Sequence, residues 1–198
     1  MNIIIPLGGR GERFSKNGYT QPKPLIPIFE KCMIEYVLDN LKINKKENDM
    51  IFIIYNTGLT EFKFTEYISK KYPCIRFIPI RDTKGAVETL FLGIDFILKN
   101  PPNPSYHNKC LILDCDTFYT ENILNAFREI DENVVFYRKK YDEKPIYSYI
   151  ELNNENNIIN IKEKDKISNN ANTGAYAFID INALYTYCKY VLDNNITF

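Results

Sequence analysis

The first predicted strand is Asn2-Ile3-Ile4-Ile5-Pro6-Leu7, followed directly by Gly8 and Gly9. A short β-branched run that ends in glycines is typical of a buried parallel strand. Similar runs predict further strands, and apolar residues at helical spacing predict helices between them. In chain order these elements are Met33–Ile43 (helix), Met50–Tyr55 (strand), Glu61–Tyr72 (helix), Ile75–Ile80 (strand), Gly85–Leu98 (helix) and Cys110–Leu113 (strand). Serial βα units of this kind predict an open, mostly parallel sheet covered on both faces.

The second half of the chain has a different pattern, with strand-like runs and few helical stretches. The predicted strands are Val134–Arg138, Ile146–Leu152, Ile158–Lys162 and Ala175–Ile179, with a hairpin turn at Asn153–Asn157 and a last helix at Asn182–Leu192. We interpret this half as a small α+β extension of the parallel sheet. The predicted fold class is therefore α/β, a Rossmann-like three-layer sandwich with a mostly parallel central sheet.

Composition excludes several classes of protein. The chain has 198 residues, with 25 Lys and Arg against 25 Asp and Glu. This balance argues against a strongly basic nucleic-acid binder and a polybasic membrane anchor. No segment approaches the roughly 18 apolar residues of a membrane span. The five cysteines are odd in number and form no Cys-x-x-Cys pair, which predicts reduced thiols in a cytoplasmic protein.

The turn after the first strand is the first candidate site. Backbone amides of Gly8, Gly9 and Gly11 could approach a polyphosphate closely, and Arg13 and Lys23 would add positive charge. The alternative is a tight turn with two surface cations. The spacing lacks the third glycine of the dinucleotide fingerprint and the Lys-Ser/Thr of a P-loop.

Asp114 and Asp116 flank Cys115 at the carboxyl end of a predicted strand. Residues i and i+2 of an extended segment point to the same side, so both carboxylates could face one Mg²⁺. The alternative is that one aspartate caps the following helix near Thr120. Hard cations do not recruit thiolates, so we assign Cys115 to packing.

These segments together resemble the sugar-phosphate nucleotidylyltransferases. Gly8-Gly9-Arg10-Gly11-Glu12-Arg13-Phe14 with Pro22-Lys23-Pro24-Leu25 is similar to that family's Gly-Gly-x-Gly-Thr-Arg-Leu and Pro-Lys-Pro-Leu signature, with Glu12 in place of Thr. Four further segments follow in family order: Gly85-Ala86, Leu113-Asp114-Cys115-Asp116, Glu163-Lys164 and Asn172-Thr173-Gly174. The resemblance implies transfer of a nucleoside monophosphate from a nucleoside triphosphate to a small phosphorylated acceptor, with release of pyrophosphate.

The resemblance also implies the nucleotide-binding residues. Arg13 and Lys23 would be catalytic, neutralising the triphosphate and the leaving pyrophosphate. Asp116 would hold Mg²⁺ directly, with Asp114 second. Leu7, Gly8, Gly9, Gly11 and Gly85 would contact the nucleotide, and Glu88 or Lys84 would contribute to recognition of the base. The alternative for Gly85 is a helix N-cap, and for Glu88 a surface charge.

For the acceptor, Lys164 would hold the phosphate and Glu163 a hydroxyl, with Asp165 in place of the family's proline. Asn172, Thr173 and Gly174 would line the pocket. The alternative for Glu163 and Lys164 is an exposed charge run from Lys162 to Lys166. A second metal-binding aspartate usually lies nearer the C-terminus in the family; Asp180 and Asp193 are candidates only by residue type.

We therefore expect a single domain over residues 1–198, with a nucleotide-binding half (1–130) and an acceptor-binding half (131–198), as the N-terminal part of a longer protein. The expected partners are a nucleoside triphosphate, with CTP slightly ahead of UTP or dTTP, and a sugar or polyol phosphate for surface polysaccharide synthesis; a homo-oligomer stays open. A metal-dependent glycosyltransferase of the same sheet type and a non-catalytic regulatory module are the alternatives. His107, the only histidine, is expected to be solvent-exposed without a role.

Overall fold

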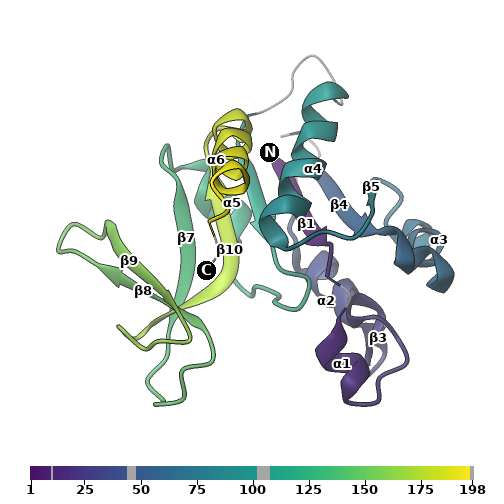
Figure 1. Ribbon diagram of the computed structural model, residues 1–198, viewed down its shortest axis with the longest axis horizontal. Helices are drawn as coiled ribbons and strands as arrows, with labels where there is room; N and C mark the ends of the chain where they lie inside the picture. The colour runs from purple at the N-terminus through teal and green to yellow at the C-terminus, as the bar shows by residue number, and fades with distance from the viewer. Residues whose placement is uncertain (10, 44–47, 102–107, 197–198) are drawn as a thin grey trace.

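Eight strands form one sheet in the order β5-β4-β1-β6-β10-β8-β9, with β7 also paired to β10 (Figure 1). The computed structural model describes residues 1–9, 11–43, 48–101 and 108–196. Four strands are parallel: β1 (Asn2–Leu7), β4 (Met50–Asn56), β5 (Arg76–Ile80) and β6 (Cys110–Leu113). Four pair antiparallel: β7 (Val134–Lys139), β8 (Ser148–Leu152), β9 (Ile158–Glu163) and β10 (Asn170–Phe178).

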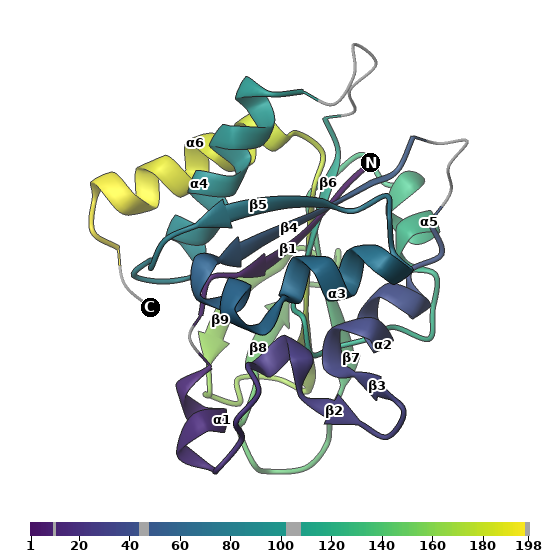
Figure 2. The same cartoon turned by 90° about the vertical axis from the view of Figure 1, so that its right-hand side faces the viewer.

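Helices cover both faces of the parallel part of the sheet (Figure 2). On one face lie α2 (Met33–Asn40), α3 (Phe64–Lys71) and α5 (Ile123–Arg128), and on the other lie α4 (Ala86–Lys99) and α6 (Ile181–Asp193). Along β1, Ile3 and Ile5 pack into the first core and Ile4 into the second, and all three are fully buried. The predicted three-layer sandwich is confirmed.

The strand β10 joins the parallel sheet to the extension, and it contains a bulge. Asn172 pairs with Tyr137 of β7, but Ala175 pairs with the next residue, Phe136, so two residues are inserted between them. Before the bulge β10 pairs with β8, and after it with β6. The bulge therefore lies at the carboxyl end of β6.

Several element boundaries differ from the predictions. The helix expected at Glu61–Tyr72 is the 3-10 helix η3 (Thr57–Phe62) followed by α3, because Lys63 between them has a left-handed backbone with φ 52°. The helix expected to reach Ile43 ends at Asn40. The strand expected from Ala175 begins at Asn170. The bulge interrupts the alternation of side chains in its first part, so the sequence pattern does not show it.

Short elements around the first turn were not predicted. They are α1 (Glu12–Lys16), η1 (Lys23–Leu25) and a hairpin of β2 (Pro27–Ile28) and β3 (Lys31–Cys32). The helix considered near Thr120 is the six-residue α5. The predicted turn at Asn153–Asn157 is confirmed, since the Asn153 side chain accepts hydrogen bonds from the Glu155 and Asn157 amides.

All five cysteines are free thiols, and only Cys74 is exposed. In the described part of the chain, no helix combines the length and the apolar character needed to cross a membrane. His107 lies outside the described residues.

Candidate functional site

The carboxyl ends of β1 and β6 lie side by side, because the two strands pair in parallel from Asn2 with Cys110 to Ile4 with Ile112. The turn after Leu7 and the segment after Leu113 therefore leave the sheet at the same edge. Ligands of open α/β sheets bind at this edge. The structure thus brings the glycine-rich turn and the two aspartates of the sequence signature together.

The glycines of the first turn have different surroundings. A Cβ at Gly8 would lie only 3.0 Å from Thr83 Oγ1 and from Thr89 Cβ, so Gly8 allows close packing against the first turn of α4. Gly9 has nothing within 4 Å of a Cβ position and is exposed. Gly11 caps α1 with a left-handed φ of 66°. Gly8 is therefore explained by packing, whereas Gly9 faces open space where a ligand could approach the backbone.

Lys23 and Asp116 form an ion pair across this edge, with Lys23 Nζ 2.8 Å from Asp116 Oδ2. Both side chains are partly exposed, at 30% and 38%. Partial burial lowers the pKa of Lys23, but nearby anionic groups, Cys115 when ionised and the carboxylates of Asp116 and Asp114, outweigh burial and raise it. Lys23 therefore stays a cation beside the aspartates. Arg13 belongs to α1, but its side chain lies outside those that the structure describes.

Asp114 is held against the bulge of β10. Its backbone amide donates to the Gly174 carbonyl at 3.0 Å, and a Cβ at Gly174 would lie 2.8 Å from Asp114 Cγ. Loss of hydration next to the surrounding protein, and then the charge of Asp116, raise the pKa of Asp114 to about 6, while Lys23 lowers it. Asp114 is thus a weaker acid than an ordinary aspartate side chain. It does not cap α5, whose N-cap is Asn122.

The three predicted pocket residues of β10 form the bulge itself. Asn172 Oδ1 accepts from the Gly174 amide at 2.8 Å, and Thr173 Oγ1 donates to the Phe136 carbonyl at 2.7 Å. Gly174 has a left-handed φ of 77°, which glycine adopts without strain. These side chains therefore shape the backbone next to Asp114, in addition to any contact with a ligand.

Two tyrosines that sequence reasoning missed lie against this bulge. The Tyr119 hydroxyl donates to the Thr173 carbonyl at 2.8 Å, and the Tyr176 hydroxyl accepts from Asn172 Nδ2 at 2.9 Å. Burial, and then the negative charge of Asp114, raise the pKa of Tyr176. The chain has 15 tyrosines, and nothing in the sequence distinguishes these two from the other 13.

Glu163 and Lys164 lie where β9 ends. Glu163 Oε2 accepts from Ser148 Oγ at 2.8 Å, and Glu163 Oε1 pairs with Lys164 Nζ at 3.1 Å. Lys164 has a left-handed φ of 52°, and its amide donates to the Tyr147 carbonyl. The charge of Glu163 also raises the pKa of Tyr176, after burial, Asp114 and the opposing Asn172 hydrogen bond. The charges of Asp114 and Glu163 therefore both act on the Tyr176 hydroxyl.

Gly85 and Glu88 lie at the start of α4. Gly85 is its N-cap in an extended conformation, with nothing within 4 Å of a Cβ position. Glu88 Oε2 accepts from the Lys84 amide at 2.6 Å, so Glu88 ties down the segment before the helix. Thr83 and Thr89 hydrogen-bond to each other at 2.7 Å beneath Gly8.

The aspartates considered for a second metal contact are placed elsewhere. Asp180 is the N-cap of α6, and the next amide, of Ile181, donates to the Asn108 carbonyl at the opposite edge of the sheet. Asp180 therefore does not join Asp116. Asp193 pairs with Lys189 on α6 at 2.7 Å. Across the described ranges, no three His, Cys, Asp or Glu residues form a cluster that could hold a metal ion by themselves.

The Nucleotidyl transferase family profile matches residues 2–192. The chain belongs to the nucleotidyl transferase family. It is 26% identical over 180 residues to the bifunctional protein GlmU of Methanocaldococcus jannaschii, covering 90% of this chain and 40% of that protein. It is 28% identical over 180 residues to a bifunctional sugar-1-phosphate nucleotidylyltransferase/acetyltransferase of Sulfurisphaera tokodaii, covering 89% and 40%. The chain thus spans less than half the length of these curated relatives.

The nucleotidyl transferase fold agrees with solved structures. A nucleoside-diphosphate-sugar pyrophosphorylase from Vibrio cholerae superposes with a TM-score of 0.75 at 21% identity, covering 96% of this chain and 78% of that one. The resemblance to the superfamily and the predicted fold class are confirmed by the profile and by this likeness.

The oxygen donors at this edge of the sheet are of the type that a magnesium ion prefers. Asp114 and Asp116 provide carboxylate oxygens at one strand end, and Mg²⁺ takes one or two protein carboxylates together with substrate phosphates.

Proposed function

We propose that this domain transfers a nucleoside monophosphate from a nucleoside triphosphate to a sugar or polyol phosphate, with release of pyrophosphate. The observation that carries the proposal is the Lys23–Asp116 pair at 2.8 Å, at the edge where the glycine-rich turn leaves β1. A cation, two carboxylates and the open backbone of Gly9 then meet at one edge of the sheet. Transfer of a nucleotidyl group needs such positioning and charge neutralisation more than it needs covalent catalysis by the protein.

In this proposal the residues of the chain act mainly by binding and by charge. Lys23, together with Arg13, neutralises the triphosphate and the negative charge that develops on the leaving pyrophosphate. Asp116, with Asp114 second, would hold a magnesium ion, which supplies additional charge neutralisation when it is bound. The exposed backbone at Gly9 and Gly85 lies against the nucleotide. No general base is needed, since an acceptor phosphate dianion is already a nucleophile near neutral pH.

The acceptor lies, in this proposal, between the bulge of β10 and the end of β9. Lys164 binds the acceptor phosphate and Glu163 a hydroxyl. After burial, the charges of Asp114 and Glu163 both raise the pKa of the nearby Tyr176. A sugar-1-phosphate is the first acceptor to test, because the Sulfurisphaera tokodaii relative is a bifunctional sugar-1-phosphate nucleotidylyltransferase/acetyltransferase. Among nucleotides we propose a pyrimidine, with CTP ahead of UTP and dTTP, and a role in surface polysaccharide synthesis in the cytoplasm.

The test is a release assay with added pyrophosphatase. Each common nucleoside triphosphate is combined with a panel of sugar-1-phosphates and polyol phosphates in the presence of Mg²⁺. We expect one triphosphate and acceptor pair to release pyrophosphate, and Lys23→Gln to slow that pair by about 10²–10³-fold. Lys99→Gln is the matched control, since Lys99 pairs with Asp95 on the surface of α4.

Two results would contradict the proposal. One is turnover of Lys23→Gln equal to that of the unmodified chain. The other is absence of pyrophosphate release from every pair, together with cleavage of a nucleoside-diphosphate sugar, which would identify a glycosyltransferase instead.

A further inference from the structure

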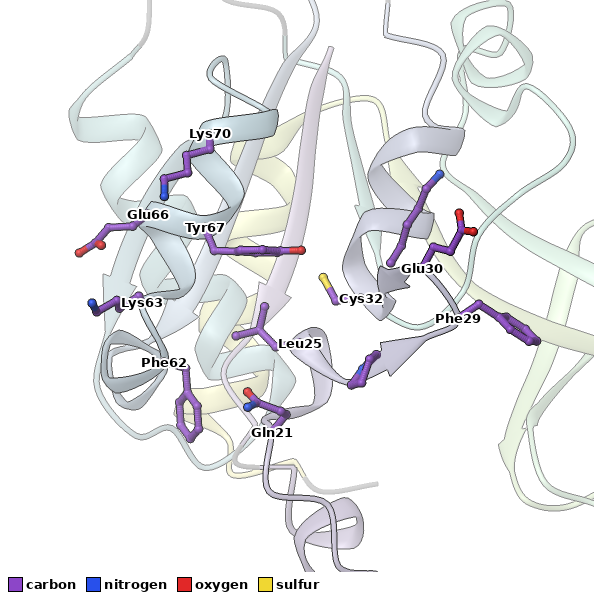
Figure 3. Close-up of a pocket in the computed structure, with 12 residues that line it drawn as sticks. Gln21, Leu25, Phe29, Glu30, Cys32, Phe62, Lys63, Glu66, Tyr67 and Lys70 are labelled. Atoms are coloured by element: carbon purple, nitrogen blue, oxygen red, sulfur yellow. The ribbon is translucent and has the colours of Figure 1, made fainter.

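A groove of about 480 Å³ lies outside the candidate site, between the β2–β3 hairpin, η1 and the segment that joins η3 to α3 (Figure 3). Its apolar lining includes Leu25, Cys32, Phe62 and Tyr67. Among the described residues, those that line it are all different from the predicted nucleotide and acceptor residues. Its volume falls within the range of binding pockets, and charged side chains surround this apolar lining.

The tip of the hairpin beside this groove carries an unusual phenylalanine. Phe29 is 96% exposed and has a left-handed backbone with φ 54°. Figure 3 shows the Phe29 ring projecting outward from the hairpin, whereas the Tyr67 ring points from α3 toward the hairpin. A bulky residue in the left-handed region costs free energy, and a large ring in water gains nothing for the monomer. Phe29 therefore does not fill the groove of its own chain.

The charges on the two walls are complementary. Glu30 follows Phe29 at the hairpin tip and is followed by Lys31. Lys63 and Lys70 lie on the opposite wall together with one acid, Glu66. None of Glu30, Lys63 and Lys70 forms an ion pair within the described ranges of the chain, although Lys31 pairs with Asp39 at 2.8 Å. Because Lys31 is already paired, the hairpin tip presents an apolar ring next to one acid. The opposite wall carries two bases and one acid, a net positive charge.

We propose that a second copy of this chain docks here, with the Phe29 ring of each copy in the groove of the other. Because the projecting ring and the groove lie beside each other on one surface, a two-fold axis between them lets both insertions occur at once. Glu30 of each copy then faces Lys63 and Lys70 across the interface. An aromatic anchor in an apolar pocket with a charged rim is the usual composition of a binding hot spot.

Sedimentation equilibrium of the unmodified chain and Phe29→Gly, from about 1 µM to about 500 µM, tests the anchor. Glycine adopts the left-handed backbone of position 29 readily, so this variant removes the ring without harming the fold. We expect a dimer whose dissociation constant rises at least tenfold in Phe29→Gly. Tyr141→Ser is the control, because Tyr141 is 74% exposed but lies outside the groove, and it should leave the constant unchanged.

A charge exchange tests the pairing of the two copies. Glu30→Lys alone, and Lys63→Glu with Lys70→Glu, should each weaken the dimer, and the triple variant should restore it. A chain that stays monomeric over the whole concentration range would overturn the proposal. So would a dimer with the same dissociation constant in Phe29→Gly, or a triple variant no stronger than its parents.

Discussion

The absent side chain of Gly174 leaves the space that the Asp114 carboxylate occupies. A Cβ at position 174 would lie 2.8 Å from Asp114 Cγ, closer than two carbon atoms can approach without displacement. The same residue accepts a hydrogen bond from the Asp114 amide and has a φ of 77°. The bulge of β10 and the end of β6 therefore hold each other in place.

Gly174→Ala should consequently damage both stability and activity. The left-handed backbone costs alanine about 1 kcal/mol, and the clash with Asp114 adds to this. We expect the free energy of unfolding in urea to fall by about 2–3 kcal/mol and pyrophosphate release to fall at least about tenfold. Unchanged stability and turnover would show that the bulge does not position Asp114.

Gly8→Ala and Gly9→Ala should differ, although the two residues are adjacent. At Gly8 the new methyl group would clash with Thr83 and Thr89, which lie close to the Cβ position. The free energy of unfolding should therefore fall by about 1–3 kcal/mol. At Gly9 the methyl group enters open space, so stability should change by less than about 0.5 kcal/mol.

Although Gly9→Ala should leave stability almost unchanged, it should weaken binding of the triphosphate. If the triphosphate lies against this backbone, Gly9→Ala should raise the KM for the triphosphate while the urea midpoint stays the same. A KM equal to that of the unmodified chain would remove Gly9 from the nucleotide site.

Stability at low pH should depend on Asp39. Burial raises the pKa of Asp39, but hydrogen bonds from Lys31, Tyr72 and Lys71 outweigh burial and lower it to about 2, from 3.8. Because the folded pKa is the lower one, this stabilisation is complete above about pH 4 and is lost as the pH falls toward 2. With a partly exposed side chain, we expect about 1–2 kcal/mol at neutral pH.

Urea unfolding of Asp39→Asn as a function of pH measures this effect. The variant should be less stable than the unmodified chain at pH 7, and the difference should shrink below pH 4. Asp193→Asn, which breaks an exposed pair with Lys189 on α6, should change stability by less than about 0.5 kcal/mol. A constant difference between Asp39→Asn and the unmodified chain at all pH values would contradict the assignment.

The parallel half of the fold could be predicted from the sequence because its signal is local. Runs such as Ile3–Ile5 and Cys110–Leu113 are buried on both faces and therefore apolar throughout. The extension was harder to delimit, since the bulge at Thr173 and Gly174 shifts the alternation of side chains within β10. Helices of five or six residues, such as α1 and α5, contain too few turns to show a period.

The site shows a similar division. Lys23 and Asp116 belong to segments of a recognisable signature, which assigns both to one nucleotide site. The structure places Lys23 Nζ 2.8 Å from Asp116 Oδ2. Tyr119 and Tyr176 could not be found in this way. Their hydrogen bonds with Thr173 and Asn172 exist only once β10 has bent.

In the proposed reaction, Lys23 and Asp116 contact one metal-bound triphosphate. The most direct measurement is a crystal structure of the chain with a non-hydrolysable nucleoside triphosphate and Mn²⁺ in place of Mg²⁺, with the metal located by anomalous scattering. We predict an anomalous peak bound to the Asp116 carboxylate, and triphosphate oxygens in contact with Lys23 Nζ. A metal and triphosphate bound elsewhere, with the Lys23–Asp116 pair intact and without ligand, would contradict the account.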